Sequence, residues 1–112
     1  RLRERSIEEL ARHHIFPREF LQENLNLDEP ESSEILINNL GNITFVHKDI
    51  NSEIGDSSPT DYLQRYSASL ETHFIPSDRN LWTVEQYTTF LQYRVRQIYR
   101  GAKQHFADIV EN

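Results

Sequence analysis

His13-His14-Ile15-Phe16-Pro17 predicts the end of a β-strand that carries two histidines. Side chains alternate between the two faces of a strand, so adjacent imidazoles point to opposite sides. One of them can then hold a metal ion while its neighbour faces a substrate. Pro17 has no N–H group and a fixed φ, so we expect the strand to run from Ala11 to Phe16 and to end there.

Length and composition indicate one small domain, residues 1–112. A chain of 112 residues can build a single modest core, and 37% hydrophobic with 27% charged residues is typical of a globular protein. No apolar run approaches the roughly 18 residues of a membrane-spanning helix, so no membrane partner is expected. The sequence has no cysteine, which excludes disulfides and thiolate metal sites and fits the reducing cytoplasm. It also has no methionine, so we interpret it as a piece excised from a longer protein.

The formal net charge of −6 argues against a stand-alone, sequence-independent DNA-binding protein. The charge is uneven, however: residues 1–58 hold six Lys and Arg against twelve Asp and Glu, whereas residues 59–112 hold six of each kind. Between Gln86 and Ala107 there are four cations and no acid. These side chains form either a solvated polar face or contacts to phosphate, and the candidates for nucleic-acid binding are Arg94, Arg100 and Lys103.

The first half of the chain is predicted to contain strands separated by a long connection. Ser6-Ile7-Glu8-Glu9 has the form of a capping box, so a short helical turn is expected before the first strand. Residues 18–34 are acidic and broken by Pro30, and a connection of this length is usually functional or mobile. Its apolar side chains are expected to fix it to the core: Phe20, Leu21, Leu25 and Leu27.

Two apolar, β-branched segments follow at residues 35–37 and 43–46, with turn-forming residues between them. The second is predicted to be a strand, and the first is either a strand or a short helix packed beneath it. Asp49 to Ile54 is expected to form a helical turn that Gly55 stops.

The second half of the chain is predicted to be helical. Ser58 as N-cap and Pro59 at the first helical position predict a helix of about three turns, through Leu70. Ile75-Pro76 ends this region, because proline disfavours the helical conformation in the residue before it.

Thr83-Val84-Glu85-Gln86 is a second capping box, and Trp82 can pack onto Tyr87 as a hydrophobic staple. Apolar residues then recur at steps of three and four. This pattern predicts one long amphipathic helix to about Val110, with Gly101 as its weak point.

Hydrolysis of a phosphodiester needs a base to activate water and a cation to stabilise charge on the phosphoryl group and the leaving oxygen. A neutral histidine titrates near the working pH and suits the first task. A second histidine and an amide oxygen suit the second, provided that they meet in space. A strand end with His13 and His14, a returning strand and a helical turn bearing Asn51 would bring them together. We therefore predict an α+β fold with a small ββα-metal core at about 11–55 and additional C-terminal α-helices at about 58–110.

Three motifs resemble those of HNH (His-Me finger) endonucleases: His14-Ile15-Phe16-Pro17, Asn39-Leu40-Gly41-Asn42-Ile43, and Asn51-Ser52-Glu53-Ile54-Gly55 followed by Pro59 and Tyr62-Leu63. Asn42 and Asn51 lie nine residues apart, which matches the HNH pattern. More narrowly, the sequence resembles the C-terminal nuclease domain of GmrSD-type modification-dependent restriction enzymes and of SspE-like phage-defence proteins. Weaker similarity continues through His73-Phe74-Ile75-Pro76, Trp82 and residues 90–94.

The resemblance implies a role for each of four residues. His14 would be the general base that deprotonates the attacking water, with 5′-phosphate and 3′-hydroxyl product ends. His13 takes the place of the first metal ligand, which is more often acidic in relatives, and Asn51 takes that of the second. Asn42 matches the central asparagine, which holds the loop and the base in place.

The implied cofactor is a divalent metal ion. Asn51 replaces the more usual histidine, and Gly55 stands where some relatives have a further ligand. Two protein ligands favour hydrated Mg²⁺ or Mn²⁺, while a histidine in place of a carboxylate leaves Ni²⁺ or Zn²⁺ open.

The resulting hypothesis is a metal-dependent DNA endonuclease domain of a bacterial restriction or phage-defence protein. By resemblance, its partners are DNA and an N-terminal nucleotide-handling domain of the same full-length protein. The alternative is a catalytically inactive, nuclease-like domain that binds DNA or protein. A structural zinc domain is disfavoured by the absence of cysteine.

Each candidate residue also has an ordinary structural interpretation. His13 and His14 can be one packed and one solvated strand histidine, and asparagines such as Asn42 and Asn51 are common in turns and caps. His47 is either a surface histidine or, four residues before Asn51, a further ligand. Two more histidines are expected to be structural or solvated: His73 and His105.

Overall fold

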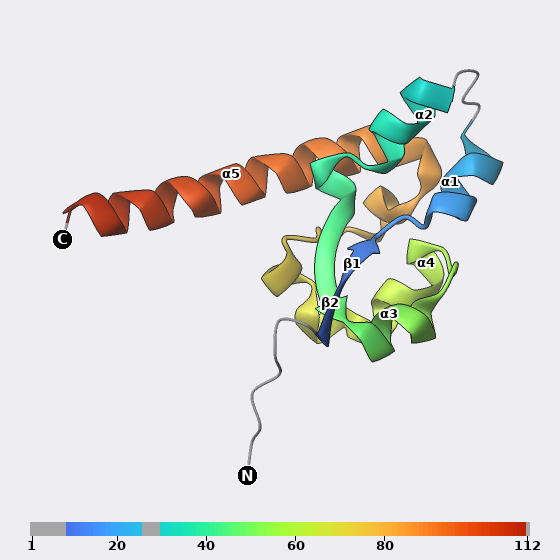
Figure 1. Cartoon of the computed structure of the whole chain (residues 1–112), viewed down its shortest axis with the longest axis horizontal. Helices are drawn as coiled ribbons and strands as arrows, with labels where there is room; N and C mark the ends of the chain where they lie inside the picture. The colour runs from blue at the N-terminus through green and yellow to red at the C-terminus, as the bar shows by residue number, and fades with distance from the viewer. Residues whose placement is uncertain (1–8, 26–29, 112) are drawn as a thin grey trace, which may run out of the picture.

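The computed structural model describes residues 9–25 and 30–111, and the elements of this part surround one antiparallel pair of strands (Figure 1). β1 (Leu10–His14) pairs with β2 (Ile43–His47). β1 stops before the predicted end at Phe16, because the Phe16 N–H group donates to the Asn42 side chain and not to a strand. The prediction of an α+β fold with a small ββα core and C-terminal helices is confirmed.

Two short helices form the connection between the strands, α1 (Arg18–Asn24) and α2 (Pro30–Ile37). The sequence did not predict α1 or the first turn of α2, which lie in the segment that it indicated as functional or mobile. Pro30 begins α2 instead of breaking the chain, because the first turn of a helix needs no N–H donor from its first residue. The alternatives for residues 35–37 are resolved in favour of a helix.

The apolar side chains of this connection pack on the core as expected. Leu21 is fully buried, and Phe20 and Leu25 are partly buried against the core. The remaining expected contact, Leu27, and the capping box that begins at Ser6 fall outside the described residues.

The returning strand and the helix after it follow the prediction. β2 leads directly into α3 (Lys48–Ile54), and His47 caps this helix by accepting a hydrogen bond from the Asp49 N–H group at 3.3 Å. Gly55 ends the helix with a φ of 56°, a conformation that glycine adopts without strain.

The segment after α3 is less regular than predicted. α4 (Pro59–Tyr62) starts at the expected proline, but the chain continues as the 3₁₀ helix η3 (Leu63–Ser69), inside which Tyr66 has non-helical dihedral angles. The predicted three-turn helix was therefore wrong. Residues 67–69 are Ser-Ala-Ser, and serine side chains compete for the backbone hydrogen bonds of a helix. Further short 3₁₀ turns are η4 (Glu71–His73), η5 (Arg79–Trp82) and η6 (Val84–Gln86).

α5 (Tyr87–Glu111) is the long helix that the apolar periodicity predicted, and it continues through Gly101. The capping box before it does not form, because the Thr83 hydroxyl donates to the Asn80 carbonyl at 3.1 Å. The first turns of α5 belong to the core, whereas its distal half projects from the body (Figure 1). Apolar side chains are exposed on the projecting part: Tyr99, Phe106, Ile109 and Val110. Within the described ranges, no helix has the length and apolar character needed to cross a membrane.

The core joins the end of β1 to α5. Phe16 is fully buried, and its ring centroid lies 4.9 Å from that of Tyr87. The 3₁₀ turn η2 (Leu40–Asn42) packs so closely against α5 that a Cβ atom at Gly41 would lie 2.7 Å from the Leu91 carbonyl oxygen. Only glycine fits this position, and the contact fixes the loop that precedes β2.

Candidate active site

β1 places its two histidines on opposite faces of the strand pair, as the alternation of side chains predicted. His13 is 4% exposed and contacts α3 and α4. His14 is half-buried on the open face, where it contacts the residue that follows α2. The two imidazoles therefore meet different partners.

His13 lies between Asn51 of α3 and Tyr62 of α4. Its Nδ1 atom is 2.9 Å from the Asn51 amide oxygen, and its Nε2 atom is 2.9 Å from the Tyr62 hydroxyl oxygen. The Tyr62 hydroxyl donates its one hydrogen to the Ile15 carbonyl at 2.6 Å, so it accepts a hydrogen bond from the His13 Nε2–H group. In the neutral ring, Nδ1 then carries a lone pair.

The pair formed by His13 and Asn51 has the chemistry of a cation site. Burial lowers the pKa of His13, the hydrogen bond with Asn51 opposes this, and positive charge on His14 or His73 lowers the pKa further. A neutral His13 directs its Nδ1 lone pair at the Asn51 amide oxygen, so two acceptors face each other. Either a turned amide or a cation between them satisfies this pair. The two residues expected to be metal ligands are thus neighbours in the fold.

The other histidines do not join this pair. His47 caps α3 and lies 3.3 Å from the Glu9 carboxylate. The Nδ1 atom of His73 is 2.7 Å from the Thr44 hydroxyl, and His105 is exposed. Across the described residues, no three side chains of His, Cys, Asp or Glu come together as a metal site.

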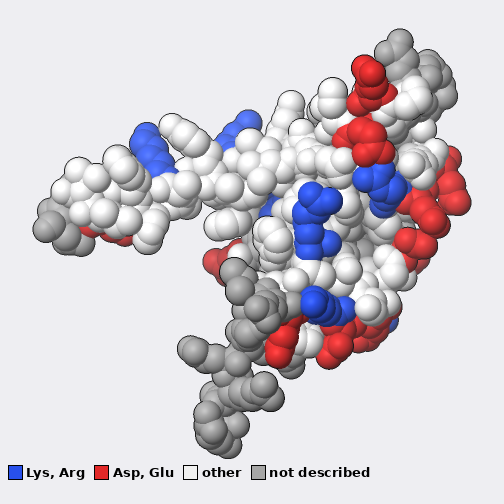
Figure 2. Space-filling view, viewed as in Figure 1, with Lys and Arg blue, Asp and Glu red and all other residues white. Residues whose placement is uncertain are grey.

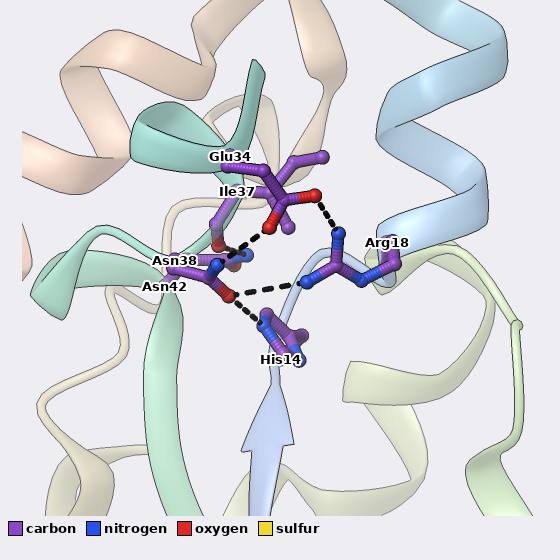
Figure 3. A network of polar contacts seen from close by, with 6 residues as sticks. All are labelled: His14, Arg18, Glu34, Ile37, Asn38 and Asn42. Atoms are coloured by element: carbon purple, nitrogen blue, oxygen red, sulfur yellow. Dashed lines mark hydrogen bonds and ion pairs between the residues drawn. The ribbon is translucent and has the colours of Figure 1, made fainter. Parts of the chain in front are cut away.

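His14 belongs to an exposed network of polar side chains on the other face (Figure 3). Its Nε2 atom lies 2.8 Å from the Asn38 amide oxygen. Arg18 donates to the same oxygen at 3.4 Å and forms an ion pair with Glu34. The Asn38 amide nitrogen donates to the Glu34 carboxylate at 2.9 Å. The hydrogen bond from Arg18 lowers the pKa of Glu34, so this carboxylate stays ionised.

Asn42 is fully buried and ties the chain after β1 to the loop before β2. Its amide oxygen accepts a hydrogen bond from the Phe16 N–H group at 2.7 Å. Its amide nitrogen donates to the carbonyls of Phe16 and Ile37, both at 3.0 Å. The side chain is therefore occupied by the backbone, which suits the holding role that the family resemblance implies.

Arg94 is buried, with 2% of its surface exposed, and this corrects its assignment as a nucleic-acid contact. Its guanidinium group donates at 2.9 to 3.3 Å to four backbone carbonyls, those of Leu40, Gly41, Ile43 and His73. Two of these carbonyls belong to η2, one to the first residue of β2 and one to the last residue of η4, and one arginine can serve several of them at once. Burial lowers the pKa of Arg94 to about 10, so the group remains charged at neutral pH.

Arg100 and Lys103 are exposed on the projecting half of α5. Figure 1 shows that this half leads away from the strand pair, so the fold does not bring these cations to the two histidines. Their assignment as nucleic-acid contacts stays a prediction for a surface outside the histidine site.

Four residues around the histidines were not among the predicted site residues: Arg12, Arg18, Asn38 and Tyr62. Arg12 is exposed on the face of His14, opposite Phe45 in the strand pair, and its spacing of two residues from His14 could have indicated this. Figure 2 shows positively charged side chains over the strand pair and acidic ones toward the rim. Tyr62 lies in a recognised motif, whereas the contacts of Arg18 and Asn38 depend on helices that the sequence did not predict.

The fold and the site define a small α+β domain whose ββα core sets two histidines and two asparagines around one strand. The sequence matches the family model of the C-terminal domain of GmrSD restriction endonucleases over residues 3–98. The chain belongs to this family, and the resemblance inferred from the motifs is confirmed. It is thus a domain of restriction endonucleases, for which DNA is the indicated substrate. No curated protein and no solved structure matched the chain.

Proposed function

We propose that this domain is a metal-dependent DNA endonuclease in which His14 is the general base and His13 and Asn51 hold the metal ion. Family membership supports the endonuclease class and DNA as the substrate. The observation that carries the finer assignment is the arrangement of adjacent histidines. One is held 2.9 Å from Asn51 inside the fold, and the other stands on an open face.

His14 takes the proton from the attacking water in this proposal. A neutral imidazole can do so near neutral pH, and a base placed in this way typically accelerates a reaction by about 10²- to 10⁴-fold. Arg12 is exposed on the same face as His14. Arg18 donates a hydrogen bond to the Asn38 side chain, which lies beside the His14 ring. The positive charge of Arg12 favours a phosphodiester beside the base, whereas that of Arg18 is paired with the Glu34 carboxylate.

His13 and Asn51 fit a divalent metal ion. A ring nitrogen and an amide oxygen converge to 2.9 Å, about the separation of two neighbouring ligands bound at roughly 2.1 Å. When bound there, the ion would stabilise negative charge on the phosphoryl group and the leaving oxygen. Two protein ligands suit Mg²⁺ or Mn²⁺, which retain water, and the imidazole also accepts Ni²⁺ or Zn²⁺.

We also propose that target choice lies elsewhere in the full-length protein, in an N-terminal nucleotide-handling domain. The net charge of −6 supports this division, since the domain by itself attracts DNA weakly. Arg100 and Lys103 on the projecting half of α5 would contact DNA away from the cut.

A second candidate function is a DNA- or protein-binding module without catalysis. The projecting half of α5 favours it, because this helix exposes apolar side chains, such as Phe106 and Ile109, beside its cations. Exposed apolar residues that gather in this way often mark a binding surface. This alternative predicts no metal-dependent cleavage.

Plasmid cleavage distinguishes the two functions. Supercoiled plasmid is incubated with the chain and Mg²⁺, Mn²⁺, Ni²⁺ or Zn²⁺, beside His14→Ala and the matched control His105→Ala, which changes an exposed histidine of α5. We expect metal-dependent cutting by the wild type and the control, and a loss of about a hundredfold or more in His14→Ala. Undiminished cutting by His14→Ala would contradict the assigned base. The absence of cutting in every metal, by this chain and by the full-length protein, would favour the binding module.

A further inference from the structure

The side chain of Asn38, which directly follows α2, lies against the ring of the proposed base. We propose that Asn38 is the positioning residue of His14. It holds the neutral ring with its hydrogen on Nε2, so that Nδ1 is the atom that accepts the proton of the attacking water. This inference rests on the proposed function, because it names the working atom of the base.

Two charged neighbours fix the orientation of the Asn38 amide. The Glu34 carboxylate can only accept hydrogen bonds, so the amide nitrogen must face it, at 2.9 Å. The Arg18 guanidinium can only donate, so the amide oxygen must face it, at 3.4 Å. A turned amide would set oxygen against carboxylate and N–H groups against guanidinium, and both contacts would be repulsive.

The fixed amide in turn fixes the tautomer of His14. The Asn38 oxygen lies 2.8 Å from Nε2, and it can only accept a hydrogen bond there. A neutral imidazole carries one hydrogen, so this hydrogen resides on Nε2 and the lone pair resides on Nδ1. No partner for Nδ1 is found among the described residues, and the residue as a whole is only half-buried.

The network is built from segments that the fold holds in place. Arg18 begins α1, whereas Glu34 lies in α2 and Asn38, four residues later, directly follows this helix. The Asn38 N–H group donates to the Glu34 carbonyl at 2.9 Å, which extends the helical geometry to Asn38. All three side chains are at or near the surface, so their contacts add little to folding stability. The network is therefore better suited to orienting His14 than to stabilising the fold.

The tautomer can be read directly from the ¹⁵N chemical shifts of the His14 ring, recorded on ¹⁵N-histidine-labelled chain at a pH where the ring is neutral. We expect the wild type to hold its hydrogen on Nε2. Asn38→Leu removes the acceptor, so both tautomers should appear, and Asn38→Gln, which keeps both the acceptor oxygen and the donor nitrogen, should restore the Nε2–H form. The matched control is Asn24→Leu, at the exposed end of α1, which should leave the ring unchanged.

Cleavage kinetics in the same variants link the tautomer to catalysis. We expect kcat of Asn38→Leu to fall about tenfold or more with KM unchanged, and Asn38→Gln to recover part of the loss. A wild-type ring with its hydrogen on Nδ1, or an Asn38→Leu variant with unchanged tautomer and kcat, would overturn the inference. The NMR result needs no activity, so it separates the two proposals. If His14→Ala cuts as well as the wild type, the proposed function fails even when Asn38 still sets the tautomer.

Discussion

On the inner face of β1, His13 is 4% exposed, and both of its ring nitrogens lie 2.9 Å from partners, Asn51 and Tyr62. On the open face, one residue further along, His14 is half-buried, and its contact is with Asn38 at 2.8 Å. The same side chain thus meets a closed environment on one face and an accessible one on the other. The surroundings of each ring therefore indicate its role: the closed histidine suits a ligand, and the open one suits a base.

The two rings nevertheless share one feature. In each, Nε2 faces an oxygen that accepts its hydrogen, the Tyr62 hydroxyl for His13 and the Asn38 amide for His14. In both neutral rings, Nδ1 is therefore the atom with the lone pair. In His13 it points at Asn51, whereas in His14 it has no partner among the described residues. The same ring atom, Nδ1, is thus left for metal binding in His13 and for proton transfer in His14.

Asn42→Ala, which removes the side-chain link between the chain after β1 and the loop before β2, should have the largest effect on stability. Asn42→Ala leaves the Phe16 N–H group and the carbonyls of Phe16 and Ile37 without their partner in the core. Each buried polar group left unpaired costs about 1–3 kcal/mol, so we expect the free energy of unfolding to fall by about 3–5 kcal/mol in urea denaturation. The control Asn24→Ala, at an exposed position, should change it by less than about 0.5 kcal/mol. A loss below about 1 kcal/mol in Asn42→Ala would contradict the holding role.

Two arginines of α5 differ in burial in the same way, since Arg94 is buried and Arg100 is exposed. Arg94→Met removes the charged donor shared by four carbonyls, and we expect the free energy of unfolding to fall by about 2–4 kcal/mol. Arg100→Met changes an exposed side chain, so stability should stay within about 0.5 kcal/mol while affinity for DNA decreases. Urea denaturation and a DNA-binding assay measure both quantities. Equal losses of stability in the two variants would argue against the structural role of Arg94.

Tyr62→Phe changes the surroundings of His13 and leaves those of His14 unchanged. It removes the hydroxyl that joins His13 Nε2 to the Ile15 carbonyl, and we expect a loss of about 1–3 kcal/mol in the free energy of unfolding. The neighbouring Tyr66→Phe is the matched control, since no hydrogen bond of the Tyr66 hydroxyl is found among the described residues. If the two variants lost the same stability, the bridge to His13 would not contribute to the fold.

A pH titration should show the smallest effect, and it also belongs to the inner face. Burial lowers the pKa of His13 below its ordinary value of 6.5, so the unfolded chain binds a proton more readily than the folded one. Stability is therefore present above about pH 6.5 and decreases as the pH falls through this value. Thermal unfolding between pH 5 and 8 should show a weaker dependence in His13→Gln than in the control His105→Gln. The same pH dependence in both variants would contradict this assignment.

Local patterns predicted the elements that carry the histidines. The alternation along β1, the β-branched strand β2, the glycine stop after α3 and the apolar period of α5 all appear in the structure. The family motifs added the pairing of His13 with Asn51, which lie 38 residues apart. These features could be predicted because each depends on a short repeat or on a motif of fixed spacing.

The rest depends on tertiary contacts that leave no local pattern. Arg94 lies on an amphipathic helix among other cations, so its burial follows only from the carbonyls that η2 and η4 bring to it. The contact of Asn38 with His14 spans 24 residues and requires α1 and α2. α1 and the start of α2 were not predicted, because their sequence is acidic and contains a proline. Tertiary packing overrode local propensity in both cases.

The division of labour between the two histidines is tested most directly by calorimetric titration of Mn²⁺ into the wild type, His13→Ala and His14→Ala in parallel. The wild type and His14→Ala should bind Mn²⁺ with similar affinity. His13→Ala should lose about a hundredfold or more, since loss of a ligand costs at least as much as loss of an outer-shell partner. Equal binding by all three chains, or binding that is lost in His14→Ala and kept in His13→Ala, would contradict the assignment of the inner face to the metal and the open face to the base.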